Sequence, residues 1–435
     1  MAPSGHNGHG LFALRQLWTW VLIVAVAGAL LYLGRQHLAF IIGVVIFIVA
    51  LLGSVMLHEL GHFLTAKKFG MKVTQFFVGF GKTLWSTFRG ETEYGLKALP
   101  LGGFVKITGM TSVEDVDVAD EPRSFRKQPG WQRIIVLAAG SFMHFVLALV
   151  LLFIVAIGIG QAAYNNQISS VATCVPASAQ ALKSANPCTG HAAKSPATAA
   201  GLKPDDKIVS IGGMPVRTWN ELRKALADEK AGVPVPMVFE RHGRTIHADV
   251  TLAAVPGRST PYLGVTPGVS YQPTGFIGGL SYAGNQFANT LTSSASAIGK
   301  LPAAIPDLFA KNRVNTPAGQ VSSVVGVGEV TGQVAQAALP WQAKASLVLL
   351  LIASLNIFVG AFNLLPLLPL DGGHLAVVIF ERIRAWFNRV RGRPDPGLVD
   401  IQRLVPLSLL VFALLVGFGT LLIAADIFNP VHIPV

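Results

Sequence analysis

The chain has 435 residues, of which 51% are hydrophobic and only 13% are charged. Soluble domains carry roughly 25% charged residues, so this composition excludes a wholly soluble protein and places much of the chain in a bilayer. The net charge of +12 comes from Lys and Arg that cluster beside apolar segments. The sequence has no nucleic-acid motif, so we interpret this charge as a topology signal and expect no nucleic-acid partner.

Five apolar segments are long enough to cross a membrane, so we expect about five transmembrane helices. They cover residues 17–33, 38–64, 134–159, 345–370 and 404–427. The first is not typical of a cleavable signal peptide, because its apolar stretch is long and only Arg15 precedes it.

The distribution of positive charge predicts the orientation of these spans. Residues 65–133 hold eleven Lys and Arg, and residues 381–403 hold six. Because such segments stay in the cytoplasm, the N-terminus would lie inside and the stretch 171–344 outside. We therefore expect a multi-pass plasma-membrane protein with a large extracytoplasmic region.

The second span contains the sequence HELGH, which is unusual inside an apolar segment. His58 and His62 are four residues apart, so they share one face of a helix, and Glu59 lies beside that face. Two neutral imidazoles bind Zn²⁺, and a nearby carboxylate takes a proton from water. This H-E-x-x-H pattern predicts a metalloprotease. The alternative is a helix end whose polar residues reach the membrane interface.

A third zinc ligand is expected from the distant stretch NLLPLLPLDGGH, residues 363–374. Asp371 follows an apolar segment and two prolines, which would unwind the backbone beside a wet cavity. Asn363 and His374 are further polar residues at this depth. The alternative is an ordinary span that ends in a Pro/Asp/Gly turn.

The region 71–133 contains short glycine-punctuated runs typical of strands, among them GGFVKI. They predict a small β-sheet against the membrane. Outside the membrane, residues 196–255 have the pattern of a small α+β domain. It has a strand at 207–211, a helix at 220–227 and a hairpin that turns at His242–Gly243.

The two cysteines, Cys174 and Cys188, lie 14 residues apart in the outer region. This spacing fits no common zinc pattern, and an extracytoplasmic location favours a disulfide over two free thiols.

The two remote motifs, their order and the intervening domain resemble those of the site-2 proteases, which are zinc-dependent intramembrane metalloproteases. The stretches VGFGKTLWSTFRGETEYGLKALPLGGFVKITGM and FERIR are similar to the bacterial branch that cleaves anti-sigma factors, especially its actinobacterial members. The resemblance runs from about residue 40 to the C-terminus. It implies that His58, His62 and Asp371 bind zinc and that Glu59 is the general base.

The same resemblance assigns substrate contacts. Asn363 would hold the substrate backbone, and Gly102 and Gly103 of the LGGF stretch would belong to a sheet that pairs with an unwound substrate; the alternative is plain turns. Where the family commonly has G-P-x-x-N, this chain has Gly140 to His144. His144 would replace the asparagine as a hydrogen-bonding group, or it is simply satisfied by a backbone carbonyl. The spacing of the second proline also departs from the family pattern.

The outer domain resembles the PDZ modules of bacterial periplasmic proteases, which implies a size filter; the alternative is a spacer. The implied fold is a polytopic α-helical membrane protein with a small membrane-associated sheet and one extracytoplasmic PDZ-like α+β domain. The implied function is zinc-dependent cleavage of a single-pass transmembrane substrate, an anti-sigma factor already trimmed by another protease. A metal transporter and a non-catalytic scaffold are the rival functions. The expected segments are 1–37, 38–70, 71–133, 134–160, 161–195, 196–255, 256–344, 345–380, 381–403 and 404–435.

Overall fold

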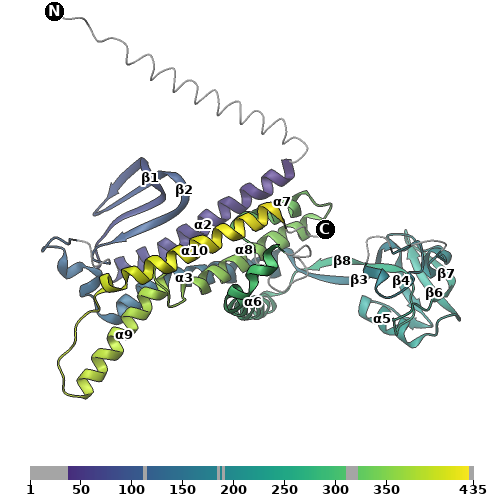
Figure 1. Ribbon diagram of the computed structural model, residues 1–435. Helices are drawn as coiled ribbons and strands as arrows, with labels where there is room; N and C mark the ends of the chain where they lie inside the picture. The colour runs from purple at the N-terminus through teal and green to yellow at the C-terminus, as the bar shows by residue number, and fades with distance from the viewer. Residues whose placement is uncertain (1–37, 111–114, 184–186, 189–191, 310–321, 431–435) are drawn as a thin grey trace, which may run out of the picture. The chain divides into compact units, whose positions relative to one another are not determined.

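The structure is a computed structural model that describes residues 38–110, 115–183, 187–188, 192–309 and 322–430 (Figure 1). It contains two compact units. One combines the residues up to Ala156 with those from Phe276 onward, and the other is Ile157–Gly275. The first predicted span, residues 17–33, lies outside the described residues.

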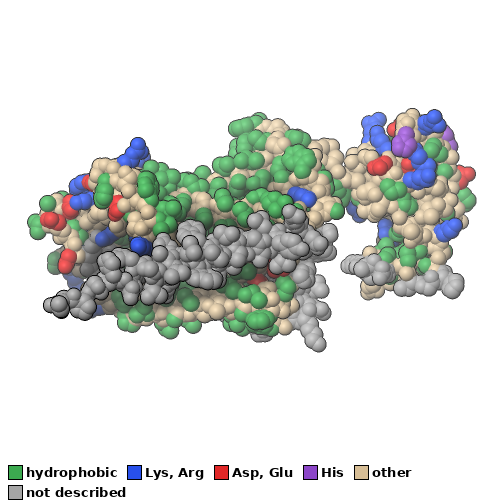
Figure 2. Space-filling view, turned by 90° about the horizontal axis from the view of Figure 1, so that it is seen from above, with side chains coloured by type: hydrophobic (Ala, Val, Ile, Leu, Met, Phe, Trp, Pro, Cys, Tyr) green, Lys and Arg blue, Asp and Glu red, His purple; other side chains and the backbone are tan. Residues whose placement is uncertain are grey.

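Among the described residues, four helices of the first unit are long and apolar enough to cross a membrane. They are α2 (Leu38–Lys68), α3 (Gly130–Ile154, continued by a π-helical turn to Ile159), α8 (Trp341–Asn363) and α10 (Val405–Phe428). Helices suit a bilayer because every backbone hydrogen bond closes within the segment. Figure 2 shows hydrophobic side chains over the visible face of this unit, with charged side chains gathered at one end. The chain is therefore a polytopic membrane protein.

Small residues let these helices approach one another closely. A Cβ on Gly61 of α2 would lie 2.5 Å from the backbone oxygen of Ala139 in α3. A Cβ on Gly360 of α8 would lie 2.7 Å from the ring of Phe145 in α3. Close approach at small residues is typical of membrane helix packing. The three helices α2, α3 and α8 therefore surround the polar residues of the site at short range.

Residues 256–335 were predicted as loops or weak helices. The described part of this interval forms a strand at 265–272 and two long helices, α6 (Phe276–Ala304) and α7 (Val324–Gln336). Ala283 of α6 is buried in a cluster with residues of α3 and α8. The Ala/Ser/Gly-rich sequence lacks the large apolar residues that mark a helix in water, but small residues pack well against membrane helices.

The small antiparallel sheet consists of β1 (Val73–Arg89) and β2 (Thr92–Ile107). Both strands are long and bent, so residues 75–78 pair with 103–106 on one side and with 93–96 on the other. The prediction of a β-rich segment after the HELGH helix is confirmed. The LGGF stretch, residues 101–104, lies within β2 and does not form a plain turn.

The predicted span 345–380 is divided into two helices. Helix α8 ends at Asn363, and α9 (Asp371–Val390) begins after a seven-residue connection. Helix α9 continues beyond the expected boundary at residue 380 and includes part of the basic segment 381–403. Its charged residues exclude it from the helices able to span a membrane.

The second unit is built on a six-stranded sheet with strand order β7-β6-β4-β3-β8, in which β5 also pairs with β4. The strands are β3 (Gln161–Val171), β4 (Lys207–Ile211), β5 (Met214–Pro215), β6 (Pro234–Arg241), β7 (Arg244–Thr251) and β8 (Val265–Gln272). Helices α4 (Pro196–Ala199) and α5 (Trp219–Asp228) complete it.

The sequence predicted the centre of this unit but not its full extent. The strand at 207–211 and the hairpin turn at His242–Gly243 are confirmed. Strands β3 and β8 lie outside the predicted domain 196–255. The prediction missed them because they pair with each other across a long stretch of chain. Cys174 and Cys188 are joined by a disulfide in this unit.

Candidate metal centre

The histidines of the HELGH motif lie on one buried face of α2. His58 is 8% exposed and His62 is 4% exposed. The Nδ1 atom of His62 donates a hydrogen bond to the backbone oxygen of Val136, at 2.7 Å. A carbonyl oxygen only accepts, so this bond fixes the tautomer of His62 and leaves its Nε2 lone pair available to a metal.

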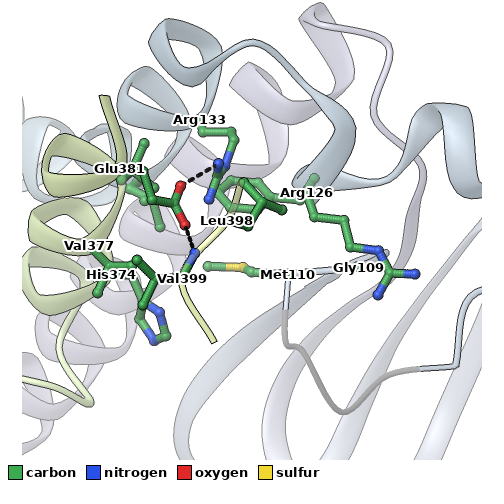
Figure 3. A pocket seen from close by; sticks show the side chains of 12 residues that line it. Gly109, Met110, Arg126, Arg133, His374, Val377, Glu381, Leu398 and Val399 are labelled. Atoms are coloured by element: carbon green, nitrogen blue, oxygen red, sulfur yellow. Dashed lines mark hydrogen bonds and ion pairs between the residues drawn. The ribbon is translucent and has the colours of Figure 1, made fainter. Parts of the chain in front are cut away.

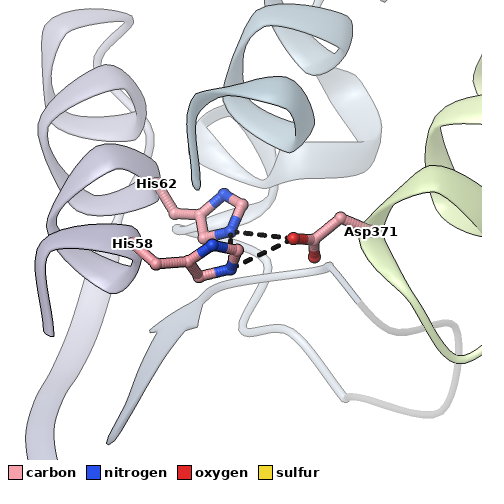
Figure 4. A group of neighbouring side chains, drawn as sticks. All are labelled: His58, His62 and Asp371. Atoms are coloured by element: carbon pink, nitrogen blue, oxygen red, sulfur yellow. Dashed lines mark hydrogen bonds and ion pairs between the residues drawn. The ribbon is translucent and has the colours of Figure 1, made fainter. Parts of the chain in front are cut away.

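Asp371 is the first residue of α9, and its side chain lies next to both histidines (Figure 4). Its Oδ2 atom lies 3.1 Å from His58 Nε2 and 3.3 Å from His62 Nε2. The two glycines that follow Asp371 explain how the chain reaches this position. A Cβ on Gly372 would lie 2.3 Å from the backbone of Leu364, so the connection 364–370 folds against the start of the helix only because Gly372 has no side chain.

The three donor atoms fit one zinc ion. The two imidazole Nε2 atoms lie 3.1 Å apart, so all three separations lie between 3.1 and 3.3 Å. Ligands at about 2.0–2.1 Å from a tetrahedral zinc are separated by roughly 3.3 Å. Among the described residues, this is the group of His, Cys, Asp and Glu side chains that has the geometry of a metal site.

Gly140 of α3 provides space for this group. A Cβ at this position would lie 2.4 Å from His62 Nε2 and 2.7 Å from His58 Nε2. Any larger residue would therefore occupy the volume in front of the two donor nitrogens. The sequence alone indicated Gly140 only as part of an altered motif, and this role was not predicted.

Glu59 links α2 to the small sheet. Its Oε2 atom accepts a hydrogen bond from the backbone N–H of Val105 in β2, at 3.0 Å. Gly103 allows this approach, since a Cβ there would lie 2.5 Å from the sulfur of Met56. Gly102 has a φ of +143°, which favours glycine. The LGGF stretch therefore passes directly beside the HELGH helix.

His144 belongs to a buried polar group that joins three helices. Its Nδ1 atom lies 3.1 Å from Ser54 Oγ of α2 and 2.8 Å from Asn356 Oδ1 of α8. The His144 ring lies 5.0 Å from the ring of His58. The structure thus satisfies His144 with side chains and not with a backbone carbonyl.

Sequence reasoning missed Ser54 and Asn356. Ser54 precedes His58 by four residues, so the two share a helix face, and this spacing could have placed Ser54 near the metal centre. Asn356 is 1% exposed in an apolar span, where an unpartnered amide would be costly. Asn363, predicted to hold substrate, is the half-buried last residue of α8, and Asp371 follows it after a short connection.

Comparison with known proteins identifies the family. The sequence profile of peptidase family M50 matches residues 46–393. The chain belongs to this family, the site-2 proteases. It is 37% identical over 411 residues to zinc metalloprotease Rip1 of Mycobacterium tuberculosis, with 91% of this chain and 99% of the relative covered. It is 36% identical to Rip1 of Mycolicibacterium smegmatis over 90% of this chain and 98% of the relative. It is also 27% identical to metalloprotease MmpA of Caulobacter vibrioides, over 79% and 88%.

The family membership and the geometry of the donor group both indicate a zinc site. The M50 chain is a zinc metalloprotease, and its cofactor is Zn²⁺. The family membership alone does not assign roles to particular residues; the convergence of His58, His62 and Asp371 supplies the physical basis for that assignment.

Proposed function

We propose that this protein is an intramembrane endopeptidase that hydrolyses a transmembrane segment of a single-pass membrane protein. The observation that carries the proposal is the position of the donor group. Two of its three members lie on α2, a helix apolar enough to span a bilayer, and the third begins α9 beside it. A proteolytic site carried by a membrane-spanning helix suits substrates that are themselves within the membrane.

Each residue of the group has a distinct part in this proposal. His58, His62 and Asp371 hold zinc, which when bound polarises a peptide carbonyl and lowers the pKa of water. Glu59 takes a proton from the attacking water and delivers it to the leaving amine. The hydrogen bond from the Val105 N–H orients the Glu59 carboxylate.

The sheet would hold the substrate in an extended form. A helical peptide bond is shielded by its own hydrogen bonds, so a transmembrane helix must unwind before hydrolysis. The LGGF stretch, including Gly102 and Gly103, passes beside Glu59 and offers backbone groups for pairing. Asn363 would hold the substrate backbone from the end of α8.

His144 would act mainly by position. Its Nδ1 atom is engaged by Ser54 and Asn356, which holds the ring beside His58. In this arrangement His144 keeps α2, α3 and α8 in register around the donor group, and its Nε2 atom remains for a hydrogen bond to the substrate.

The second unit would restrict which substrates enter. We propose that it is a PDZ-like domain outside the cell, that the site faces the cytoplasmic side, and that the domain excludes substrates whose ectodomain is intact. The disulfide supports an oxidising location. The substrate would then be an anti-sigma factor already trimmed by another protease, a class suggested by the family resemblance.

The test compares the purified protein with its Glu59→Gln variant in liposomes. Each is mixed with a tagged transmembrane helix of a candidate anti-sigma factor without its ectodomain, and zinc content is measured in parallel. Cleavage by the parent alone, with zinc in both, supports the proposal. Glu240→Gln, on β6 of the other unit, is the matched control and should cleave as the parent does. Equal cleavage by the parent and Glu59→Gln would exclude Glu59 as the base.

A further inference from the structure

Helix α9 carries an apolar stripe that the protein leaves exposed. Six large side chains along it are between 41% and 69% exposed. They are Ile379, Phe380, Ile383, Trp386, Phe387 and Val390. Their spacing of three and four residues places them on one side of the helix. This stripe begins two turns after Asp371 and continues to the end of α9.

Arginines border the stripe on both sides. With about 100° of rotation per residue, Arg382 and Arg389 lie along one border, and Arg384 and Arg391 lie along the other. The Arg391 guanidinium lies 4.4 Å from the centre of the Phe387 ring, and that of Arg384 lies 5.8 Å from the Phe380 ring. Their apolar stems therefore follow the stripe. The Arg391 charge sits at its edge, the arrangement by which arginine reaches lipid phosphates, whereas the Arg384 guanidinium donates to the backbone oxygen of Gly397, at 2.7 Å.

The acidic residues of α9 do not neutralise this surface. Glu381 is 7% exposed and forms an ion pair with Arg133 at 2.8 Å, as Figure 3 shows. The other carboxylate oxygen of Glu381 accepts a hydrogen bond from the backbone N–H of Val399, at 2.8 Å. Asp371 lies at the beginning of the helix in the candidate metal centre. The exposed side of α9 within the described residues is therefore apolar and cationic.

Two hollows flank the helix with complementary chemistry. One, of about 400 Å³, is lined by Arg126, Arg133, Arg382 and Arg389 with Trp386, against the acids Glu381 and Asp395. The other, of about 350 Å³, is lined by apolar side chains that include Leu367, Phe380, Leu404 and Leu407. The first suits an anionic headgroup, and the second suits an acyl chain.

We propose that α9 lies along the membrane–water interface and binds anionic phospholipid. Its apolar stripe rests among acyl chains, and the bordering arginines bind headgroup phosphates. The chain itself argues for this occupant, because α9 stands between two spanning helices, α8 and α10, and is too charged to cross the bilayer. Because Asp371 is the first residue of α9, lipid binding would also steady one side of the metal centre. That last step rests on the proposed function, whereas lipid binding does not.

The test measures hydrogen–deuterium exchange of residues 376–393 in the full protein in lipid nanodiscs. One set contains phosphatidylcholine alone, one contains added phosphatidylglycerol, and one contains phosphatidylcholine with inorganic phosphate in solution. Exchange in the parent should slow on the order of tenfold with phosphatidylglycerol, because arginines near an anionic surface are attracted to it. Soluble phosphate should have no such effect.

Two variants and a control make the test specific. Replacing Arg382, Arg389 and Arg391 by Gln should abolish the difference between lipids, and replacing them by Lys should retain it. The control removes the same charge from the other unit through Arg217→Gln, Lys224→Gln and Arg244→Gln, and should behave as the parent. Equal exchange of the parent in both lipids, or equal protection by soluble phosphate, would overturn the proposal. Zinc content and proteolysis in the same nanodiscs report separately on the proposed function.

Discussion

Gly140 and His62 approach so closely that a single methyl group would not fit between them: a Cβ on Gly140 would lie 2.4 Å from His62 Nε2. Gly140→Ala should therefore displace the imidazole and weaken zinc binding by about tenfold or more, as changes around a metal site commonly do. The measurement is zinc affinity by chelator competition in detergent. Gly53→Ala is the control, since a Cβ there meets nothing within 4 Å. Equal affinity in both variants would show that the imidazoles bind metal in another position.

Asp371→Asn should lower zinc occupancy while the helices remain folded. The substitution keeps the size of the side chain but removes the negative charge that lies 3.1 Å from His58 Nε2 and 3.3 Å from His62 Nε2. We expect a loss of metal affinity larger than that caused by Gly140→Ala, with proteolysis lost in proportion. Metal analysis and circular dichroism check this expectation. Asp249→Asn, an exposed position on β7, is the control. Full zinc occupancy in Asp371→Asn would remove Asp371 from the ligand set.

The metal centre shows which parts of a site a sequence can specify. His58 and His62 were predictable because their relation is local: four residues on a helix always share a face. Asp371 was only a candidate from its polar character beside two prolines, and the family resemblance supported it, because the approach of α9 to α2 depends on the folded connection at 364–370. The contact of Ser54 with Asn356 joins positions 302 residues apart, and no local pattern encodes it.

The fold divides in the same way. Long apolar runs predicted α2, α3, α8 and α10, because a bilayer demands continuous hydrophobic helices. Helix α6 was predicted only as a loop or a weak helix, because its small residues are weak signals in sequence but pack closely on α3 and α8. Strands β3 and β8 were missed because their pairing is long-range and their residues are largely polar.

The group Ser54, His144 and Asn356 should behave as one unit. Asn356→Leu would leave the other two buried side chains short of a partner, and we expect a loss of about 1 kcal/mol of stability together with a higher KM. A double-mutant cycle with Ser54→Ala tests the coupling by thermal unfolding and by kinetics. The double variant should lose less than the sum of the single losses. Additive losses would mean that the two residues act independently.

The second unit should lose stability in acid through Asp206. Its side chain is fully buried, which raises the pKa of the carboxyl, but hydrogen bonds from Arg241 and from the Lys203 N–H outweigh burial and hold the pKa below its ordinary value. A lowered pKa stabilises the folded state above the unfolded value of about 3.9, and this contribution is lost as pH falls through the folded value.

Asp206→Asn removes the titrating group, so its effect should be large near neutral pH and small in strong acid. The measurement is amide exchange of β4 and β6 in the full protein across this pH range, after correction for the intrinsic rate. The parent should lose protection below about pH 4, whereas the variant should start less protected and change less. Asp228→Asn, at the end of α5, controls for a general change of charge in this unit. The same acid sensitivity in the parent and Asp206→Asn would assign the acid response to other carboxylates.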